Sequence, residues 1–360
     1  MSLTPVHGER GADGETRAGA APEQRSGDGA PPLTVQGRGF PTNRGGLCQK
    51  GWTSARVLTV PDRITVPLVR RGGQLVPATW DEALDLIASR VRALQAEHGP
   101  ESIAVFGGGG LTNEKAYALG KFARTVLRTP NIDYNGRFCM ASAAAGANRS
   151  LGVDRGLPFP LADVGGADAV LLLGSNLAET MPPSVQHLAG ARAAGGLVVM
   201  DPRRSLTVGL AADGQGVHVQ PVPGTDLAVL LGLLHVVLAE GLHDAEYLAT
   251  RTTGLEDVAR SVAAWWPERV EQVTGVSPAT LRRVARILAA ASPARGGVGA
   301  YILTGRGVEQ SRQGTATVNA AINLALALGL PGRVGSGYGA ITGQGNGQGG
   351  REHGQKADQL

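Results

Sequence analysis

The chain has 360 residues, of which 42% are hydrophobic, and its formal net charge is only +4. This length is enough to bury a large core and indicates two or more folding units. Because the charge is small and no basic stripe alternates with aromatic residues, we expect no nucleic-acid partner. No apolar run approaches the ~20 residues that cross a bilayer, and the N-terminus lacks the apolar stretch of a signal peptide. The two cysteines are too few for a disulfide framework and fit a reducing compartment, so we expect a cytoplasmic protein with no membrane partner.

Residues 1–34 are rich in Gly, Ala, Pro, Glu and Arg and contain almost no large apolar residues. A segment of this composition cannot bury enough apolar surface to become ordered, so we predict a disordered leader. Residues 35–71 contain short β-prone pieces at 56–60 and 65–70, which Pro61 and Pro67 interrupt.

From residue 72 onward the pattern changes to strands that alternate with helices. The sequence TWDE at 79–82 is a capping box and predicts the start of an amphipathic helix. Strongly apolar segments follow at intervals, and we predict buried strands at 102–106 and 167–174 and further strands at 197–201, 217–220 and 297–303. Strands rich in Val and Leu that alternate with helices predict an α/β fold with a parallel sheet covered on both faces.

Polar groups follow three of these predicted strands, at the ends where doubly wound sheets bind ligands. Residues 174–179 offer backbone N–H groups, a hydroxyl and a carboxylate. Residues 201–203 offer an acid that could bind a ribose hydroxyl and an arginine that could pair with phosphate. Residues 224–226 place a hydroxyl and a carboxylate at a helix N-terminus, where they could meet the N–H groups of a purine. Each set could also be a turn with a helix cap, and the glycines at 107–110 do not have the spacing of a dinucleotide fingerprint.

Cys139 lies where turn formers, among them Asn135 and Gly136, run into an Ala-rich segment that favours a helix. At a helix N-terminus the macrodipole and the free backbone N–H groups favour a thiolate, which is a nucleophile and a soft metal ligand. Most free cysteines are instead small buried apolar residues, and the spacing alone leaves both possibilities open.

The order of motifs from about Gly37 to Leu360 resembles that of the molybdopterin-guanine-dinucleotide oxidoreductases, the dimethyl sulfoxide reductase superfamily. Within it, the resemblance is closest to the catalytic subunits of assimilatory nitrate reductases. The motifs that carry it are those at 46–51 (GLCQKG), 112–117 (TNEKAY), 135–140 (NGRFCM), 174–179 (GSNLAE), 201–203 (DPR), 223–226 (PGTD), 305–311 (GRGVEQS) and 341–352 (ITGQGNGQGGRE).

The resemblance implies a bis-molybdopterin guanine dinucleotide cofactor whose molybdenum is bound by the thiolate of Cys139, with Asn135 nearby. It also implies cofactor contacts from three further groups of residues. These are Gly174, Ser175, Asn176 and Glu179 in one loop; Asp201, Pro202, Arg203, Gly224, Thr225 and Asp226 at a guanosine end; and Arg306 and Gln310 from the last strand–helix unit. Lys50 corresponds to a lysine between an iron–sulfur cluster and the pterin, and Cys48 to the last of four cluster ligands.

The implied reaction is the reduction of nitrate to nitrite by oxygen-atom transfer, with a small anionic substrate and an electron-donor protein or domain as partners. Formate oxidation by the same superfamily is the alternative. Formate oxidation in this superfamily would use a histidine directly after the metal-ligating cysteine, and this chain has Met140 at that position.

Two departures from the family pattern lead to further expectations. The family supplies three cluster cysteines upstream of the position of Cys48, and residues 1–47 contain none, so the ligand set of a [4Fe–4S] cluster is incomplete here. The chain also ends inside a family segment. We therefore expect a partial catalytic subunit that lacks a C-terminal half, or a non-catalytic remnant that keeps the sheet.

For the domain organisation, the resemblance implies two Rossmann-like parallel-sheet domains, one inserted in the other. We expect the leader at 1–34, a remnant of an iron–sulfur β domain at 35–71, an incomplete α/β domain at 72–150 plus 295–360, and an inserted α/β domain at 151–294 that binds a guanosine end. The periodicity of the sequence would equally allow one long sheet.

Overall fold

The structure is a computed structural model that describes residues 2–5, 33–58, 60–154, 156–211 and 216–357. The chain divides into two compact units. The first unit comprises Met1–Val105 and Lys121–Asn131, and the second comprises Phe106–Gly120 and Ile132–Leu360.

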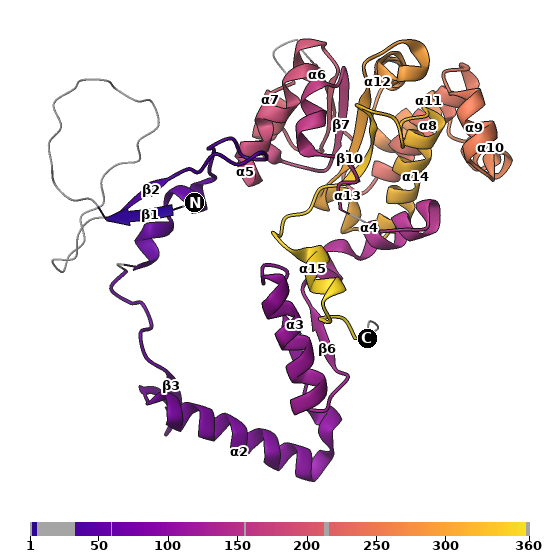
Figure 1. The fold of residues 1–360 in the computed structure, drawn as a ribbon. Helices are drawn as coiled ribbons and strands as arrows, with labels where there is room; N and C mark the ends of the chain where they lie inside the picture. The colour runs from indigo at the N-terminus through magenta and orange to yellow at the C-terminus, as the bar shows by residue number, and fades with distance from the viewer. Residues whose placement is uncertain (1, 6–32, 59, 155, 212–215, 358–360) are drawn as a thin grey trace, which may run out of the picture. The chain divides into compact units, whose positions relative to one another are not determined.

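The first unit contains two antiparallel strand pairs and one long helix (Figure 1). Its elements are β1 (Ser2–Pro5), β2 (Leu33–Gln36), α1 (Gln49–Trp52), a 3₁₀ helix (Ser54–Leu58), β3 (Leu68–Arg71), β4 (Gln74–Pro77) and α2 (Trp80–His98). The predicted disordered leader lies mostly outside the described residues. Where residues 1–34 are described, Ser2–Pro5 pairs with Leu33–Gln36, so these ends of the leader differ from the prediction. The predicted strand at 56–60 also differs, because residues 54–58 form the 3₁₀ helix.

Helix α2 begins at the predicted capping box. The Thr79 hydroxyl accepts a hydrogen bond from the Glu82 N–H at 3.2 Å, which satisfies one free donor of the first turn. The helix ends at Gly99, whose φ of +84° is the left-handed conformation that glycine adopts easily. Its apolar side chains, including Trp80 and Ile87, are exposed.

The second unit is built around one parallel five-stranded sheet (Figure 1). The strands are β7 (Ala169–Leu173), β8 (Leu197–Met200), β9 (Gly216–Val219), β10 (Ala300–Thr304) and β11 (Gly337–Ala340), in the spatial order β11-β10-β7-β8-β9. Every residue of β7, β8, β10 and β11 is buried, as expected for a sheet covered on both faces. The predicted α/β class is confirmed.

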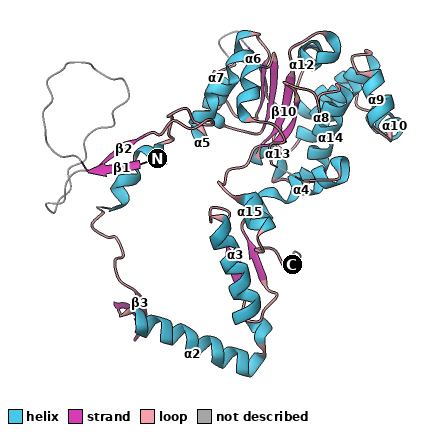
Figure 2. Cartoon of the chain, viewed as in Figure 1, coloured by secondary structure: helices cyan, strands magenta, loops and turns pink. Residues whose placement is uncertain are grey.

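Helices cover both faces of this sheet (Figure 2). Alternate residues of each strand belong to two separate apolar cores, one on each face. Leu171 and Leu173 pack in a core with α8 (Asp226–Ala239), α12 (Pro278–Ala291) and α14 (Gly314–Ala327). Val170 and Leu172 pack on the other side, with residues of α6 (Ala189–Ala193) and α7 (Leu206–Gly209).

The sheet does not divide near residue 295, which differs from the expected domain boundary. We expected residues 295–360 to join the segment 72–150. Instead β10 pairs in parallel with β7, with Leu303 opposite Leu172, and β11 pairs with the other edge of β10. The reason is that β7 is buried on both faces and needs a hydrogen-bonded neighbour at each edge, so the chain returns through α8–α12 to supply one.

The order of strands creates a switch point between β7 and β10. From β7 the chain proceeds outward to β8 and β9, and it then returns to the opposite edge of β7 as β10. Crevices at such a switch point, beyond the carboxyl ends of the strands, are where open parallel sheets bind ligands. The candidate site is therefore expected at the residues that follow β7 and β10.

The other strands and helices of the described residues are β5 (Val105–Gly107), α3 (Asn113–Lys121) with a π-helical turn (Phe122–Val126), β6 (Ile132–Tyr134), α4 (Gly136–Leu151), α5 (Leu177–Thr180), α9 (Ala245–Arg251), α10 (Leu255–Val262), α11 (Pro267–Thr274), α13 (Arg306–Glu309) and α15 (Gly347–Glu352). Short 3₁₀ helices lie at Pro100–Ser102, Leu161–Gly166, Pro182–Leu188 and Pro293–Arg295. Within the described ranges, we find no helix with the length and apolar character that crossing a membrane would require.

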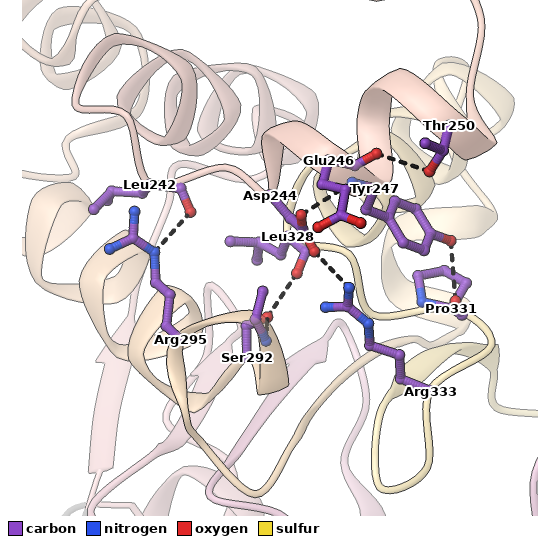
Figure 3. A network of polar contacts seen from close by, with 11 residues as sticks. Leu242, Asp244, Glu246, Tyr247, Thr250, Ser292, Arg295, Leu328, Pro331 and Arg333 are labelled. Atoms are coloured by element: carbon purple, nitrogen blue, oxygen red, sulfur yellow. Dashed lines mark hydrogen bonds and ion pairs between the residues drawn. The ribbon is translucent and has the colours of Figure 1, made fainter.

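A polar network ties the segment before β11 to the helices around it (Figure 3). Arg333 forms an ion pair with Asp244 at 2.7 Å, and the Tyr247 hydroxyl donates to the carbonyl of Pro331 at 3.0 Å. The buried Ser292 hydroxyl donates to the carbonyl of Leu328 at 2.8 Å. These bonds hold the connection from α14 to β11 against the start of α9 and the end of α12.

The strand-end loops after β7 and β10 leave no room for a side chain at Gly174. Its φ is +58°, and an added Cβ would lie 2.7 Å from the Val308 nitrogen. At Gly195, φ is +73° but nothing lies within 4 Å of an added Cβ. We expect Gly195→Ala to lower the free energy of unfolding by about 1 kcal/mol from backbone strain alone. Gly174→Ala should cost about 1–3 kcal/mol more, because it adds overpacking.

Urea unfolding of the two variants measures this difference. Equal costs for the two substitutions would contradict the close approach of the loops at Gly174.

Candidate functional site

A cavity of about 580 Å³ lies at the carboxyl ends of the strands in the second unit. Its wall includes Leu177 after β7, Leu303 in β10, and Ala340 and Ile341 at the end of β11. This volume is within the range of small-molecule sites in proteins. Among the predicted site residues, none lines the cavity directly, although several lie in the same loops.

A glycine-rich loop at 341–349 forms one wall of this cavity and is tied to the loop at 107–113. The Asn346 N–H donates to the carbonyl of Gly109 at 2.8 Å, and its side-chain amide donates to the Asn113 oxygen at 2.9 Å. An added Cβ at Gly109 would lie 2.1 Å from Oε1 of Gln344, so the end of that side chain would have to move to admit it. Gly109 therefore lets the Gln344 side chain pack closely against its loop.

Cys139 lies in the first turn of α4, and its thiol is half-buried. Asn135 precedes the helix, and its Oδ1 accepts a hydrogen bond from the N–H of Gly109 at 2.8 Å. The predicted placement of the thiol at a helix start is confirmed. Asn319 on α14 donates to Ser150 at 2.6 Å, which fastens the far end of α4.

Arg306 connects the Cys139 segment to the wall of the cavity. Its Nη1 donates to the Cys139 carbonyl and contacts Sδ of Met140, and its Nη2 donates to the carbonyl of Ile341 at 3.0 Å. Ile341 lines the cavity. The guanidinium thus joins α4 to the end of β11, and its buried Nε has no hydrogen-bond partner among the described residues.

Glu309, one turn after Arg306 on α13, forms an ion pair with it, and its side chain is completely buried. Burial raises the pKa of Glu309 to about 7, although the Arg306 guanidinium and hydrogen bonding by Thr304 and Arg306 lower it. The Thr304 hydroxyl is also hydrogen-bonded to the Tyr338 hydroxyl at 3.0 Å. Burial also raises the pKa of Tyr338, while the hydrogen bond with Thr304 lowers it.

The loop after β7 has the polar groups that the sequence predicted, and several are bonded within the protein. Ser175 is buried. The Asn176 side chain accepts a hydrogen bond from the Thr207 hydroxyl at 2.8 Å and donates to Glu179. Glu179 is exposed. Gly174 lies against the start of α13, where the Gly307 N–H donates to its carbonyl at 3.0 Å.

The loops after β8 and β9 bring two carboxylates near each other. Asp201 accepts a hydrogen bond from the Arg203 N–H at 2.8 Å, and Pro202 and Arg203 are exposed. Burial raises the pKa of Asp226, its backbone hydrogen bond lowers it, and the nearby Asp201 raises it further. Thr225 precedes α8 but its side chain does not cap the helix, and its hydroxyl donates to the Val222 carbonyl at 2.7 Å. Gly224 has a φ of +85°.

The remaining predicted site residues are Gln310, Cys48 and Lys50. Gln310 is exposed at the end of α13. Cys48 directly precedes α1 in the first unit and is half-buried, and Lys50 is exposed on that helix. Among the described residues, no group of three or more His, Cys, Asp or Glu side chains could hold a metal ion.

Three residues of the site were not singled out from the sequence: Glu309, Asn113 and Asn346. Each lies inside a motif that the sequence analysis quoted, at 305–311, 112–117 and 341–352. These motifs are the sequence signal that could have singled the three residues out. The burial of Glu309 beside Arg306 is seen only in the structure.

Comparison with known proteins decides the family of the chain. Residues 63–360 match the family model for molybdopterin oxidoreductases. The chain belongs to the molybdopterin oxidoreductase family. It is 40% identical to the assimilatory nitrate reductase catalytic subunit of Bacillus subtilis (strain 168), over 91% of this chain and 45% of that protein. It is 34% identical to formate dehydrogenase H of Escherichia coli (strain K12), over 82% of this chain and 41% of that protein.

A solved structure supports the fold. The acetylene hydratase from Pelobacter acetylenicus has a TM-score of 0.66 and 24% sequence identity, and the match covers 80% of this chain and 39% of that chain. This molybdopterin oxidoreductase chain thus spans less than half the length of these relatives.

The family implies a molybdenum–pterin cofactor, and the residues of the second unit fit such a group. Gly345, Gly347 and Gly349 line the cavity, so the backbone can approach a ligand closely there. The half-buried thiol of Cys139 is a soft donor of the kind that transition metals accept. The buried Nε of Arg306 has a proton to donate to a further acceptor. An iron–sulfur cluster does not fit, because the chain has two cysteines and a [4Fe–4S] cluster needs four ligands.

The raised pKa of Glu309 predicts a pH-dependent stability. Between its usual value of 4.5 and about 7, the folded chain keeps a proton that the unfolded chain releases. The free energy of unfolding should therefore fall as the pH rises through this window, by at most about 3 kcal/mol from this group. In Glu309→Gln this part of the fall should vanish.

Urea unfolding of the parent chain and the variant at several pH values within this window measures the difference. The matched control is Glu240→Gln, which removes a partly exposed acid paired with Arg286 at 3.0 Å. Parallel pH profiles for the parent and Glu309→Gln would contradict the raised pKa.

We also predict that the chain, purified without oxygen, carries no stoichiometric [4Fe–4S] cluster, because its cysteines cannot supply the ligands. Iron and acid-labile sulfide assays measure this. A brown preparation with about four iron atoms per chain would refute it.

Proposed function

We propose that this chain is part of the catalytic subunit of a molybdenum oxidoreductase that reduces nitrate to nitrite. The cofactor in this proposal is a bis-molybdopterin guanine dinucleotide bound through Cys139. The observation that carries the proposal is the position of Cys139 in the first turn of α4, joined through Arg306 to Ile341 in the wall of the cavity.

In this proposal, the strand-end loops of the second unit hold the cofactor. Gly174, Ser175, Asn176 and Glu179 would contact it after β7. The guanosine end would be bound after β8 and β9, by Asp201, Pro202, Arg203, Gly224, Thr225 and Asp226. The charge of Asp201 helps to raise the pKa of Asp226, after the effect of burial. Carboxylate oxygens are acceptors that match the ribose hydroxyls and the N–H groups of guanine, which supports this role.

The bound cofactor would supply oxygen-atom transfer coupled to a two-electron change at molybdenum. The chain supplies the ligand and its surroundings. The thiolate of Cys139 would bind the metal. Arg306 and Asn135 hold the turn that carries Cys139. Arg306 donates to the Cys139 carbonyl, and Asn135 accepts a hydrogen bond from the N–H of Gly109 in a neighbouring loop. Gln310, at the exposed end of α13, would contact the cofactor from the same side as Arg306.

Electrons must come from a donor protein or domain, and we propose that Lys50 lies on their path. Cys48 stands where the family resemblance implies a cluster ligand, but the chain's two cysteines do not supply a ligand set, so no electron step is assigned to a cluster here. We further propose that the protein acts in the cytoplasm together with the segment that corresponds to the other half of its relatives.

Nitrate is favoured over formate by Met140. This residue follows the proposed metal ligand, and its sulfur contacts Arg306, where a formate-oxidising relative would use a basic histidine. Relatives named for nitrate reduction and for formate oxidation both match the chain, so formate oxidation remains the second candidate function. The third candidate is a non-catalytic chain that keeps the sheet and has no turnover.

Cys139→Ser tests the proposal in protein produced in a host that makes the molybdenum cofactor. Because the variant replaces the soft ligand, we expect nitrite formation with reduced viologen to fall at least about 100-fold. The unfolding midpoint should stay unchanged, since the thiol is half-buried and small. The matched control is Ala141→Ser, which adds a hydroxyl at an exposed position in the same turn and should keep its turnover.

Undiminished turnover in Cys139→Ser would contradict the assignment of Cys139 as the molybdenum ligand. Formate-dependent reduction of viologen without nitrite formation would favour the second candidate. Bound molybdenum without either activity would favour the third.

A further inference from the structure

Glu309 is an acid that is buried completely at the end of a four-residue helix. Carboxylates are rarely buried unless they are paired, because removing an unpaired charge from water is costly. Arg306 is the cation that faces it, and Thr304 and Tyr338 provide the polar surroundings. Neither the family motif nor the predicted cofactor contacts assign a role to Glu309.

The position of Arg306 depends on this acid. A free arginine side chain has about 2 kcal/mol of rotamer entropy, which must be offset before its donors point in fixed directions. Glu309 lies three residues along the same helix, where side chains on one face meet. The ion pair therefore leaves the guanidinium oriented toward α4 and β11.

From that orientation, Arg306 holds two segments that are distant in the sequence. It donates to the carbonyl of Cys139, which is 167 positions away, and to the carbonyl of Ile341 at 3.0 Å. Both acceptors are backbone groups. The contact thus determines where the main chain of the first turn of α4 lies relative to the wall of the cavity.

We propose that Glu309 is a positioning residue that orients Arg306 and, through it, fixes the Cys139–Met140 turn against Ile341. Its importance for catalysis rests on the proposed function, because Cys139 is the proposed metal ligand. The effect on the turn itself is a property of the chain without cofactor. A ligand held in place beforehand binds a metal without paying the entropy of ordering the turn.

Hydrogen–deuterium exchange of the full chain, prepared without cofactor, tests this proposal. In Glu309→Met, which keeps the volume and removes the charge, the peptide that contains Cys139 and Met140 should exchange at least about tenfold faster. Glu309→Gln, which keeps one hydrogen bond to Arg306, should give an intermediate rate. Glu240→Gln, which removes a carboxylate paired with Arg282 and Arg286 on another helix, should leave this peptide unchanged.

A double-mutant cycle separates positioning from a general structural role. If Glu309 acts through Arg306, then Glu309→Met should change the exchange of this peptide by less than about twofold when Arg306→Met is already present. The buried amides of β7 report the global fold in every variant. If Glu309→Met fails to fold by this measure, the same comparison with Glu309→Gln decides.

Two results would overturn the proposal. One is an exchange rate in the Cys139 peptide within about twofold of the parent when Arg306 is present. The other is acceleration of equal size with and without Arg306, or of equal size in β7, which would show that Glu309 acts on stability alone. Because no cofactor is needed, these results are independent of whether the chain reduces nitrate.

Discussion

The parallel pairing of β10 with β7 is the interaction on which the rest of the second unit depends. It places Leu303 opposite Leu172 and gives β7 a neighbour at the edge that β8 does not occupy. Buried backbone groups need partners, and a strand with both faces covered can find them only in adjacent strands. Through this pairing, the loops after β7 and β10 meet at the switch point of the sheet, and the carboxyl ends of three strands open on one cavity.

The approach at this switch point is close enough to explain the glycines. Gly174 has a left-handed backbone and lies against Val308, and Gly109 lies against Gln344 in the neighbouring wall. A side chain at Gly174 would meet backbone atoms and separate the loops, whereas one at Gly109 would displace the end of the Gln344 side chain. The polar groups nearby are therefore held by backbone packing and by bonds within the protein, which is the rigidity that a cofactor site requires.

Arg306 shows how a group predicted to contact a ligand can also have a structural role. Sequence motifs placed it in the site, and in the structure its guanidinium is bonded to the carbonyls of Cys139 and Ile341 and paired with Glu309. Its Nε is left for a further acceptor. The residue therefore joins the ligand-bearing turn to the cavity, and a direct contact with the cofactor would add to that role.

By itself, the sequence determined the local features of this protein. The apolar run at 167–174 predicted the buried strand β7, whereas the buried strand predicted at 102–106 is the short β5 (Val105–Gly107), in which Phe106 is exposed. Thr79 predicted the start of α2, and the turn formers before Cys139 predicted a thiol at a helix start. These depend on neighbours within a few residues. It also predicted which polar residues follow β7, β8 and β9.

The tertiary structure alone decided which strands are neighbours, that residues 295–360 belong to the same sheet as 151–294, and that Glu309 faces Arg306 in the interior. Strands pair through backbone hydrogen bonds, which are the same whatever the side chains are. The sequence of β10 therefore does not predict that β7 is its partner. The burial of Glu309 likewise comes from elements distant in the chain. The physical reason is the same in both cases, because non-local packing sets the surroundings that decide what a residue can do.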